Sequence, residues 1–123
     1  MSDLKEDKLS DLSMKLSVEI LKLVDELEKK HEKIISNQIG RSATSVCANI
    51  AESKFAHGRA DFIAKLQIAL KEANETEKWL EMLKQTEKID ETRYKELYSL
   101  CSTVRFLLNR SIKTAKSNIK GQP

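Results

Sequence analysis

The sequence predicts an all-α protein that folds as an antiparallel up-and-down four-helix bundle, in a single domain spanning residues 1–123. Two observations carry this prediction. The chain has only three Gly and one Pro, and that Pro is its last residue, so little interrupts a helix. Apolar residues recur at steps of three and four along four successive stretches, which is the spacing of one helix face.

The first helix is expected near residues 10–30, with Ser10 as its N-cap and Asp11 in its first turn, where an acid suits the helix dipole. Its core face is formed by Leu12, Leu16, Ile20, Leu23, Val24 and Leu27. A second apolar strip, made of Met14, Val18 and Leu21, lies outside this face. The helix therefore has more apolar surface than one core face needs.

The second helix is expected near residues 36–55, with Ser36 as its N-cap and Gly58 as the stop signal that follows. Its core face is formed by Ile35, Ile39, Ala43, Val46 and Ile50. Small side chains lie beside that face, at Gly40, Thr44, Cys47, Ala48 and Ala51. A narrow polar stripe completes the helix, at Gln38, Arg41, Ser45, Asn49 and Glu52.

The third helix is expected near residues 60–86 and the fourth near residues 90–118, with Asp90 as its N-cap. The third has its core face at Phe62, Leu66, Ala69, Ala73, Leu80 and Leu83, and a second apolar strip at Ile68, Trp79 and Met82. The fourth has its core face at Tyr94, Leu97, Cys101, Val104, Leu108, Ile112 and Ala115. Short links between these helices favour antiparallel neighbours.

The second helix is poor in charge, because residues 38–53, QIGRSATSVCANIAES, contain only Arg41 and Glu52. An exposed helix normally shows a wide charged face. We therefore expect a second copy of the chain to cover part of this helix in a homo-oligomer, the alternative being a monomer with a weakly charged surface. The expected interface residues are Gly40, Thr44 and Ala48, with the strips Met14, Val18, Leu21 and Ile68, Trp79, Met82.

The polar stripe of the second helix has two interpretations. Arg41 and Glu52 lie about 16 Å apart along the axis, so they cannot pair with each other. One interpretation is a hydrogen-bonded network with another helix or subunit, since a buried charge needs a partner. The other is a polar groove or pore lining that receives a ligand.

The segment QIGRSATSVCANIAES resembles the pattern QLRRAAVSIPANIAEG of the four-helix-bundle family encoded in 23S rRNA intervening sequences. The matching residues are Gln38, Arg41, Ser45, Asn49, Ile50, Ala51 and Glu52. A second block of the family, EFxxFLxIALGSLxELExxL, is matched by Asp61, Phe62, Ile63, Leu66, Ile68, Ala69, Leu70, Glu75 and Leu80. The chain departs from these patterns at Gly40, Ser53, Lys71 and Glu72.

The resemblance implies an up-and-down bundle that assembles as a homopentamer. The family looks related to the accessory variability protein of diversity-generating retroelements, which engages reverse transcriptase and nucleic acid. The resemblance thus implies RNA, or a nucleoprotein such as a reverse transcriptase complex, as a partner. Gly40 stands where the family often has a second Arg, which removes one positive charge beside Arg41.

Catalysis, a cofactor and a metal site are not expected. Neither His31 nor His57 has a Cys or carboxylate at a spacing typical of a catalytic or metal site. A metal-binding bundle of the carboxylate type needs Glu-x-x-His pairs on two helices, and this chain has none. It also has no phosphate-binding loop and no nucleophile elbow.

The sequence of the fourth helix predicts a basic surface, because no acid follows Glu96. The positive charge is thus concentrated near the end of a chain whose net charge is only +3. Lys95, Arg110, Lys113, Lys116 and Lys120 share one helix face with Phe106 and could hold RNA phosphates. The alternative is that these cations form a solvated face, since positive charge near a helix C-terminus interacts favourably with the helix dipole. The protein would then be a protein-interaction or structural scaffold with no nucleic-acid role. Aromatic platforms for stacking bases are not expected.

The composition predicts a cytoplasmic protein with no membrane contact. No apolar run approaches the roughly 20 residues that span a bilayer. The charged start MSDLKEDKLSD lacks the apolar segment of a signal peptide. In that compartment Cys47 and Cys101 are expected to stay reduced.

Overall fold

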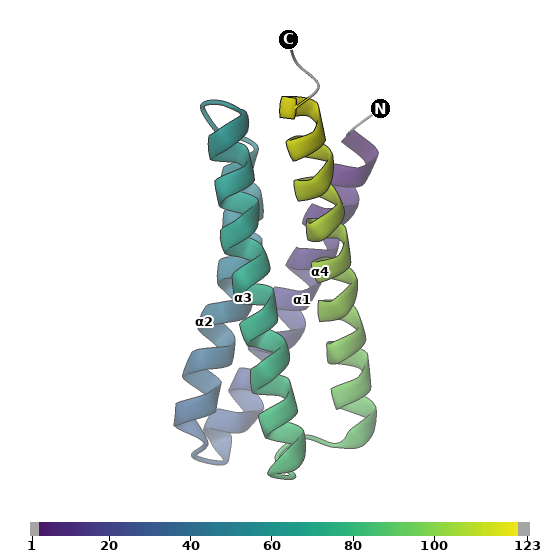
Figure 1. The fold of residues 1–123 in the computed structure, drawn as a ribbon. Helices are drawn as coiled ribbons and strands as arrows, with labels where there is room; N and C mark the ends of the chain where they lie inside the picture. Colours follow the sequence, from purple (N-terminus) through teal and green to yellow (C-terminus); the bar gives the residue numbers. More distant parts are fainter. Residues whose placement is uncertain (1–2, 121–123) are drawn as a thin grey trace.

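A computed structural model describes residues 3–120 of the chain, with side chains described from residue 8 to residue 118. Its helices are α1 (Asp3–Lys29), α2 (Lys33–Ser53), α3 (Arg59–Gln85) and α4 (Glu91–Lys120). Successive helices run in opposite directions and pack side by side, and α4 closes against α1 (Figure 1). The predicted up-and-down four-helix bundle is confirmed, and no strand occurs between residues 3 and 120.

The core runs the length of the bundle and consists of the apolar faces that the sequence predicts. Every helix contributes side chains that are almost fully buried, among them Leu16, Ile39, Leu80 and Leu108. Tyr94 and Phe62, at the ends of their predicted faces, are partly buried against this core. The three- and four-residue spacing therefore identified the buried side of all four helices.

The predicted beginnings of the first two helices are wrong. Helix α1 is already helical from Asp3, so Ser10 and Asp11 lie inside it rather than at its N-terminus. Helix α2 begins at Lys33, and Ser36 is buried in its first turn with its hydroxyl donating to the Lys33 carbonyl at 3.1 Å. Both serines were placed as caps because a cap and a buried helical Ser look alike in sequence.

The predicted N-cap of α4 is confirmed. The backbone N–H of Arg93 donates to the Asp90 carboxylate at 2.7 Å, which satisfies one of the free donors at the start of the helix. The predicted bounds of α3 differ from the observed ones by one residue at each end. Helix α4 continues to Lys120, two residues beyond its predicted end at residue 118.

The α1–α2 and α3–α4 turns share one backbone geometry that the sequence does not predict. His31 and Glu87 have positive φ values of 63° and 58°, the conformation that normally favours Gly. In each turn the next residue donates back into the helix, Glu32 to Leu27 and Lys88 to Leu83, both at 2.9 Å. These paired hydrogen bonds end α1 and α3 as Schellman motifs without a glycine.

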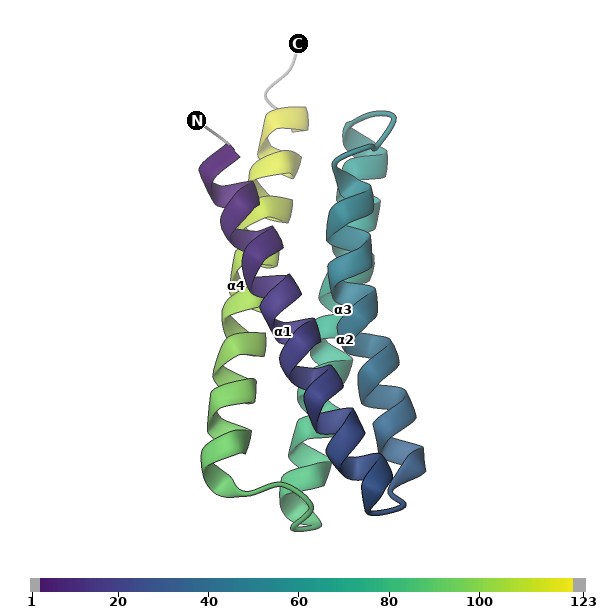
Figure 2. The same ribbon diagram turned by 180° about the vertical axis from the view of Figure 1, so that it is seen from behind.

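Gly40 was predicted for an interface between subunits, but it is buried within the chain. An added Cβ at this position would lie 3.3 Å from Cγ2 of Val24 on α1. On the same side of α2, the Ser17 hydroxyl of α1 donates to the Ala43 carbonyl at 3.1 Å. The small residue at position 40 therefore serves the close packing of α1 on α2, which Figure 2 shows from behind.

We expect Gly40→Leu to lower the free energy of unfolding by about 1–3 kcal/mol, because extra methylenes must displace Val24. Gly58→Leu is the matched control, since nothing lies within 4 Å of an added Cβ there. Gly58→Leu should lower the free energy of unfolding by under about 1 kcal/mol, because Leu is a less favourable N-cap of α3 than Gly. Urea unfolding followed by circular dichroism measures both, and equal costs would contradict the close α1–α2 contact.

Candidate functional site

A cluster of three charged side chains joins α2 to α3 at the polar stripe. The Arg41 guanidinium donates to Glu72 at 2.8 Å and to Glu75 at 2.9 Å. The side chain of Glu72 is only 8% exposed, whereas that of Arg41 is 55% exposed. The Glu72 charge, together with the hydrogen bonds that Arg41 donates to both carboxylates, raises the pKa of Arg41. This arrangement favours the network interpretation of Arg41 and Glu75, and it is made within one chain.

The other residues of the predicted polar network are divided between the helix and its surface. Ser45 and Asn49 bond to each other within α2, at 3.2 Å between the Asn49 amide and the Ser45 hydroxyl. Glu52 lies 3.8 Å from Lys65 of α3, and Gln38 is exposed. Of the stripe, only Arg41 and Glu52 reach α3, and only the Arg41 cluster holds a buried charge.

A second buried carboxylate, Glu77, lies between α3 and α4; the sequence offered it only as one of four glutamates of a carboxylate metal site that was not expected. It accepts hydrogen bonds from Arg105 at 2.9 Å and from the Ser102 hydroxyl at 3.1 Å. The hydrogen bond to Glu77 raises the pKa of Arg105, and burial raises the pKa of the neighbouring Cys101 thiol to about 12. The Arg105 and Ser102 side chains of α4 both donate to Oε2 of Glu77, so this cluster joins α3 to α4.

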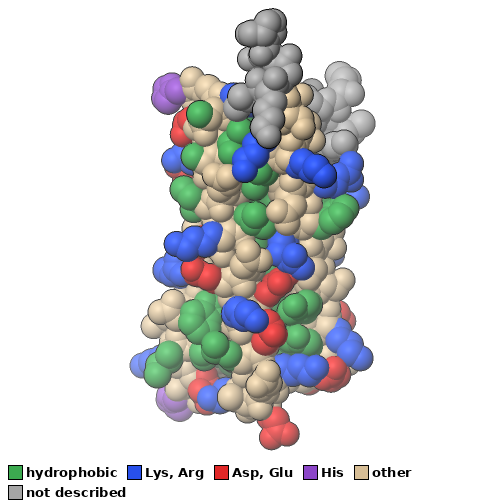
Figure 3. All heavy atoms as spheres, in the orientation of Figure 1, with side chains coloured by type: hydrophobic (Ala, Val, Ile, Leu, Met, Phe, Trp, Pro, Cys, Tyr) green, Lys and Arg blue, Asp and Glu red, His purple; other side chains and the backbone are tan. Residues whose placement is uncertain are grey.

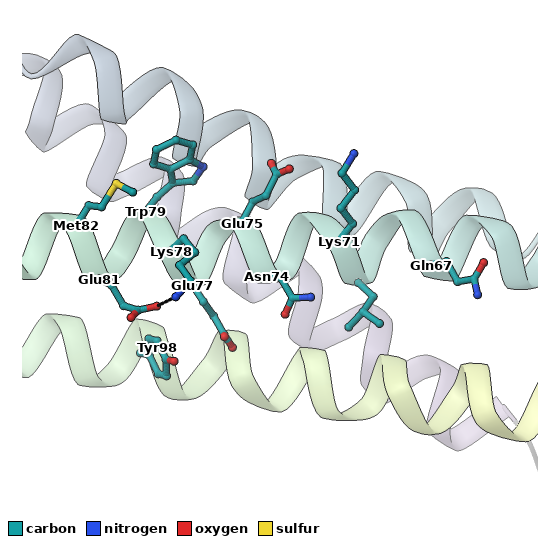
Figure 4. Close-up of a pocket in the computed structure, with 11 residues that line it drawn as sticks. Gln67, Lys71, Asn74, Glu75, Glu77, Lys78, Trp79, Glu81, Met82 and Tyr98 are labelled. Carbon is teal, nitrogen blue, oxygen red and sulfur yellow. Dashed lines mark ion pairs between the residues drawn. The ribbon is translucent and has the colours of Figure 1, made fainter.

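An open groove of about 680 Å³ runs along the outer side of α3. Trp79 and Glu75 point toward α2, whereas Glu77 and Glu81 point toward α4, where Tyr98 lies (Figure 4). Two of its acids are engaged by Arg41 and Arg105, and Glu81 is paired with Lys78 at 3.5 Å. The groove thus presents balanced charge, and its carboxylates are held by cations.

The carboxylates described here do not assemble a metal site. No group of three or more His, Cys, Asp or Glu side chains within residues 8–118 is arranged to hold a metal ion. None of the described helices is long and apolar enough to cross a membrane.

Basic residues gather at the end of the bundle that carries the α2–α3 turn and the C-terminal turns of α4. On the face in Figure 3, Lys and Arg side chains occur from end to end, whereas acids lie mainly over the middle and the opposite end. We call these residues the basic end: Lys54, Arg59, Arg110, Lys113 and Lys116. All five are exposed, and none forms an ion pair with a described carboxylate.

Two members of the predicted basic surface do not belong to the basic end. Lys95 shares the helix face, but it lies about 22 Å along α4 from Arg110 and pairs with Glu91 at 3.8 Å. The side chain of Lys120 lies outside the described residues. Lys54 and Arg59 are additions, brought to this end by the α2–α3 turn rather than by helix periodicity.

Most of the expected interface strips are exposed in the single chain. Met14, Val18 and Leu21 on α1, and Ile68 and Met82 on α3, have large exposed apolar side chains. Ala48 is exposed on α2, and Thr44 is half-buried with its hydroxyl donating to the Gly40 carbonyl at 2.8 Å. Trp79 packs partly against the core, with an indole N–H that is buried and has no acceptor among the described residues.

Comparison with known proteins identifies relatives over most of the chain. A model of the family described as 23S rRNA-intervening sequence protein matches residues 5–110. A crystal structure from Bacteroides thetaiotaomicron, a protein of unknown function from the S23 ribosomal protein family, is 44% identical with a TM-score of 0.86. That likeness covers 89% of this chain and 98% of the other. No curated protein matches the chain.

We expect Arg41→Met to lower the urea midpoint of unfolding, because it leaves the Glu72 carboxylate buried without its cation. Adding Glu72→Gln in that background should recover most of the loss. Lys65→Met is the control, since its exposed contact with Glu52 is long and should contribute little. An Arg41→Met variant as stable as the parent, or one that Glu72→Gln does not rescue, would contradict the role of the cluster.

Proposed function

This chain belongs to the 23S rRNA-intervening sequence protein family, and we propose that it is a non-enzymatic homo-oligomer that binds RNA phosphates through its basic end. The observation that carries the proposal is the unpaired, exposed state of Arg110, Lys113 and Lys116 relative to the described carboxylates. Cations that have no acidic neighbour retain their full attraction for a phosphate backbone.

The charge distribution supports the basic end over the rest of the surface. At the opposite end, Lys88 pairs with Glu32 at 2.8 Å and Arg93 pairs with Glu26 at 3.2 Å. Both cations are neutralised by a neighbouring acid, Glu32 in the α1–α2 turn and Glu26 on α1. They are therefore less available to a polyanion than the unpaired cations of the basic end.

The family supports the choice of RNA over another polyanion. The family takes its name from the intervening sequences of 23S rRNA, and the neighbour from Bacteroides thetaiotaomicron is placed in the S23 ribosomal protein family. Because the family looks related to the accessory variability protein, a nucleoprotein is the second kind of partner proposed for the same surface. A scaffold that binds only proteins is the competing function, and the RNA experiment below separates the two.

Assembly into a ring would use the two apolar strips that flank α2. The Ser17–Ala43 hydrogen bond brings the α1 strip, Met14, Val18 and Leu21, alongside α2 on one side. The Arg41 bonds bring α3, with Ile68 and Met82, alongside it on the other. Two different strips on opposite sides of α2 suit head-to-tail contacts, which close into rings. The proposed ring is a homopentamer, as the resemblance implies.

We expect the double substitution Lys113→Glu and Lys116→Glu to weaken binding of a labelled structured RNA by at least about tenfold and to lower the slope of affinity against salt by about 1 or more. Lys95→Glu is the matched control, because Lys95 lies on the same face of α4 in the other half and already pairs with Glu91. Fluorescence anisotropy at several salt concentrations measures both. Unchanged affinity in the double variant would contradict the proposal.

We expect Ala48→Glu to reduce the mass in solution from about five copies to one copy of 14.0 kDa, because a carboxylate would be buried between subunits. Ser99→Glu is the control, since Ser99 is an equally small, exposed residue on α4. Light scattering after gel filtration gives the masses. A parent that is already one copy, or an Ala48→Glu variant that keeps the parent's mass, would refute the assembly.

A further inference from the structure

Phe55 lies in the turn between α2 and α3 with its side chain 83% exposed. The turn itself is held by backbone hydrogen bonds, from Phe55 to the Glu52 carbonyl at 3.0 Å and from Ala56 to the Ser53 carbonyl at 3.2 Å. The ring therefore projects from a hydrogen-bonded turn and takes little part in the core. Because the ring stays in water, the folded chain does not gain the free energy that burial of a large apolar side chain would provide.

The Phe55 turn belongs to the basic end of the bundle. Lys54, which precedes Phe55, lines the same small hollow as Ser111 of α4, next to Arg110 and close to Lys113. Figures 1 and 2 agree in placing the α2–α3 turn at the same end as the last turns of α4. Arg59 follows at the start of α3. An exposed aromatic ring thus lies at the same end of the bundle as the cations to which RNA binding is assigned, and Lys54 precedes it directly in the chain.

We propose that Phe55 stacks on an unpaired base of single-stranded RNA whose phosphates contact the basic end. This inference rests on the proposed function and names the form of RNA that the surface prefers. An aromatic ring beside cations is the arrangement that single-strand-binding surfaces use, because every base has a face that can stack. The bases of a duplex already stack on one another and cannot cover the ring.

The surroundings of Phe55 favour a base over a lipid surface. A helix or turn that enters a membrane interface needs several apolar side chains on one face. Phe55 is the one large, exposed hydrophobic side chain in the α2–α3 turn, and the described part of α4 beyond Arg110 has none. One ring can cover one base, but it provides little area for insertion between acyl chains.

Two exposed aromatic rings, Phe55 and Phe106, are the candidates for stacking a base, although the sequence predicted no such platform. Besides Phe55, Phe106 is exposed on α4, where the Arg110 guanidinium lies 5.7 Å from its ring centre. That ring is already covered on one face by a cation of its own helix. Phe55 has no such cation–π partner among the described residues, so it is the ring available for a base.

The experiment compares a labelled single-stranded oligoadenylate with an RNA duplex of the same length, titrated with the full chain at low salt. We expect Phe55→Ala to weaken single-strand binding about tenfold, the scale of one lost base–aromatic stack, and to leave duplex binding unchanged. Phe55→Trp should retain the parent's single-strand affinity. Ile34→Ala is the matched control, because Ile34 is 82% exposed at the opposite end and should affect neither RNA.

Three outcomes would overturn the inference: Phe55→Ala without effect, an equal loss for single strand and duplex, or Phe55→Trp as weak as Phe55→Ala. Vesicles of phosphatidylcholine and phosphatidylglycerol test the lipid source. Binding to them that requires Phe55, with single-strand affinity unchanged, would assign the ring to a membrane instead. The Lys113→Glu, Lys116→Glu variant, measured alongside, separates the two proposals. If that variant binds as the parent does, the basic end fails as a phosphate surface whatever Phe55 does.

Discussion

Helix α2 can lie close to α1 and α3 at once because several of its side chains at these contacts are small or hydroxylic. Toward α1, Gly40 leaves room for Val24 and the Ala43 carbonyl accepts from Ser17 at 3.1 Å. Toward α3, the Ser42 and Thr76 hydroxyls lie 2.8 Å apart in the buried interior. Larger or charged residues at these positions would separate the helices or leave polar groups without partners. This constraint explains much of the low charge of α2 within a single chain.

The same packing determines where charge is neutralised and where it remains free. Arg41 compensates the buried Glu72, and Arg105 compensates the buried Glu77, so the two buried acids each hold a cation from another helix. At the α1–α2 and α3–α4 turns, further ion pairs, Lys88 with Glu32 and Arg93 with Glu26, neutralise part of the local charge. The last turns of α4 have no acid after Glu96, and at the α2–α3 turn Asp61 accepts from the His57 backbone N–H at 3.2 Å, so the cations of the basic end form no ion pair with a described carboxylate.

The sequence predicted the four helices, their buried faces and the family, because all three depend on local periodicity and on a specific run of residues. It did not predict that the helices would start before Ser10 and Ser36, since a buried Ser resembles a cap. The turns at His31 and Glu87 gave no signal, because each adopts a glycine-like conformation without a glycine.

The candidate site was predicted only in part. Arg41 and Glu75 were chosen from the motif, but their meeting with Glu72 depends on the register of α2 against α3, which no local pattern contains. Lys95 was grouped with Lys113 by helix face, although distance along the axis separates them. Phe55, Lys54 and Arg59 were missed because a turn, rather than a periodic face, carries them to the end of α4.

The most direct test of this account is amide NMR of the deuterated full chain during titration with single-stranded RNA at low salt. The account predicts that amide chemical shifts change at residues 54–59 and along α4 from Phe106 onward. The signals of residues in the α1–α2 and α3–α4 turns should not shift. Shifts centred on those two turns, or no shifts at all, would contradict the assignment of nucleic-acid binding to the basic end.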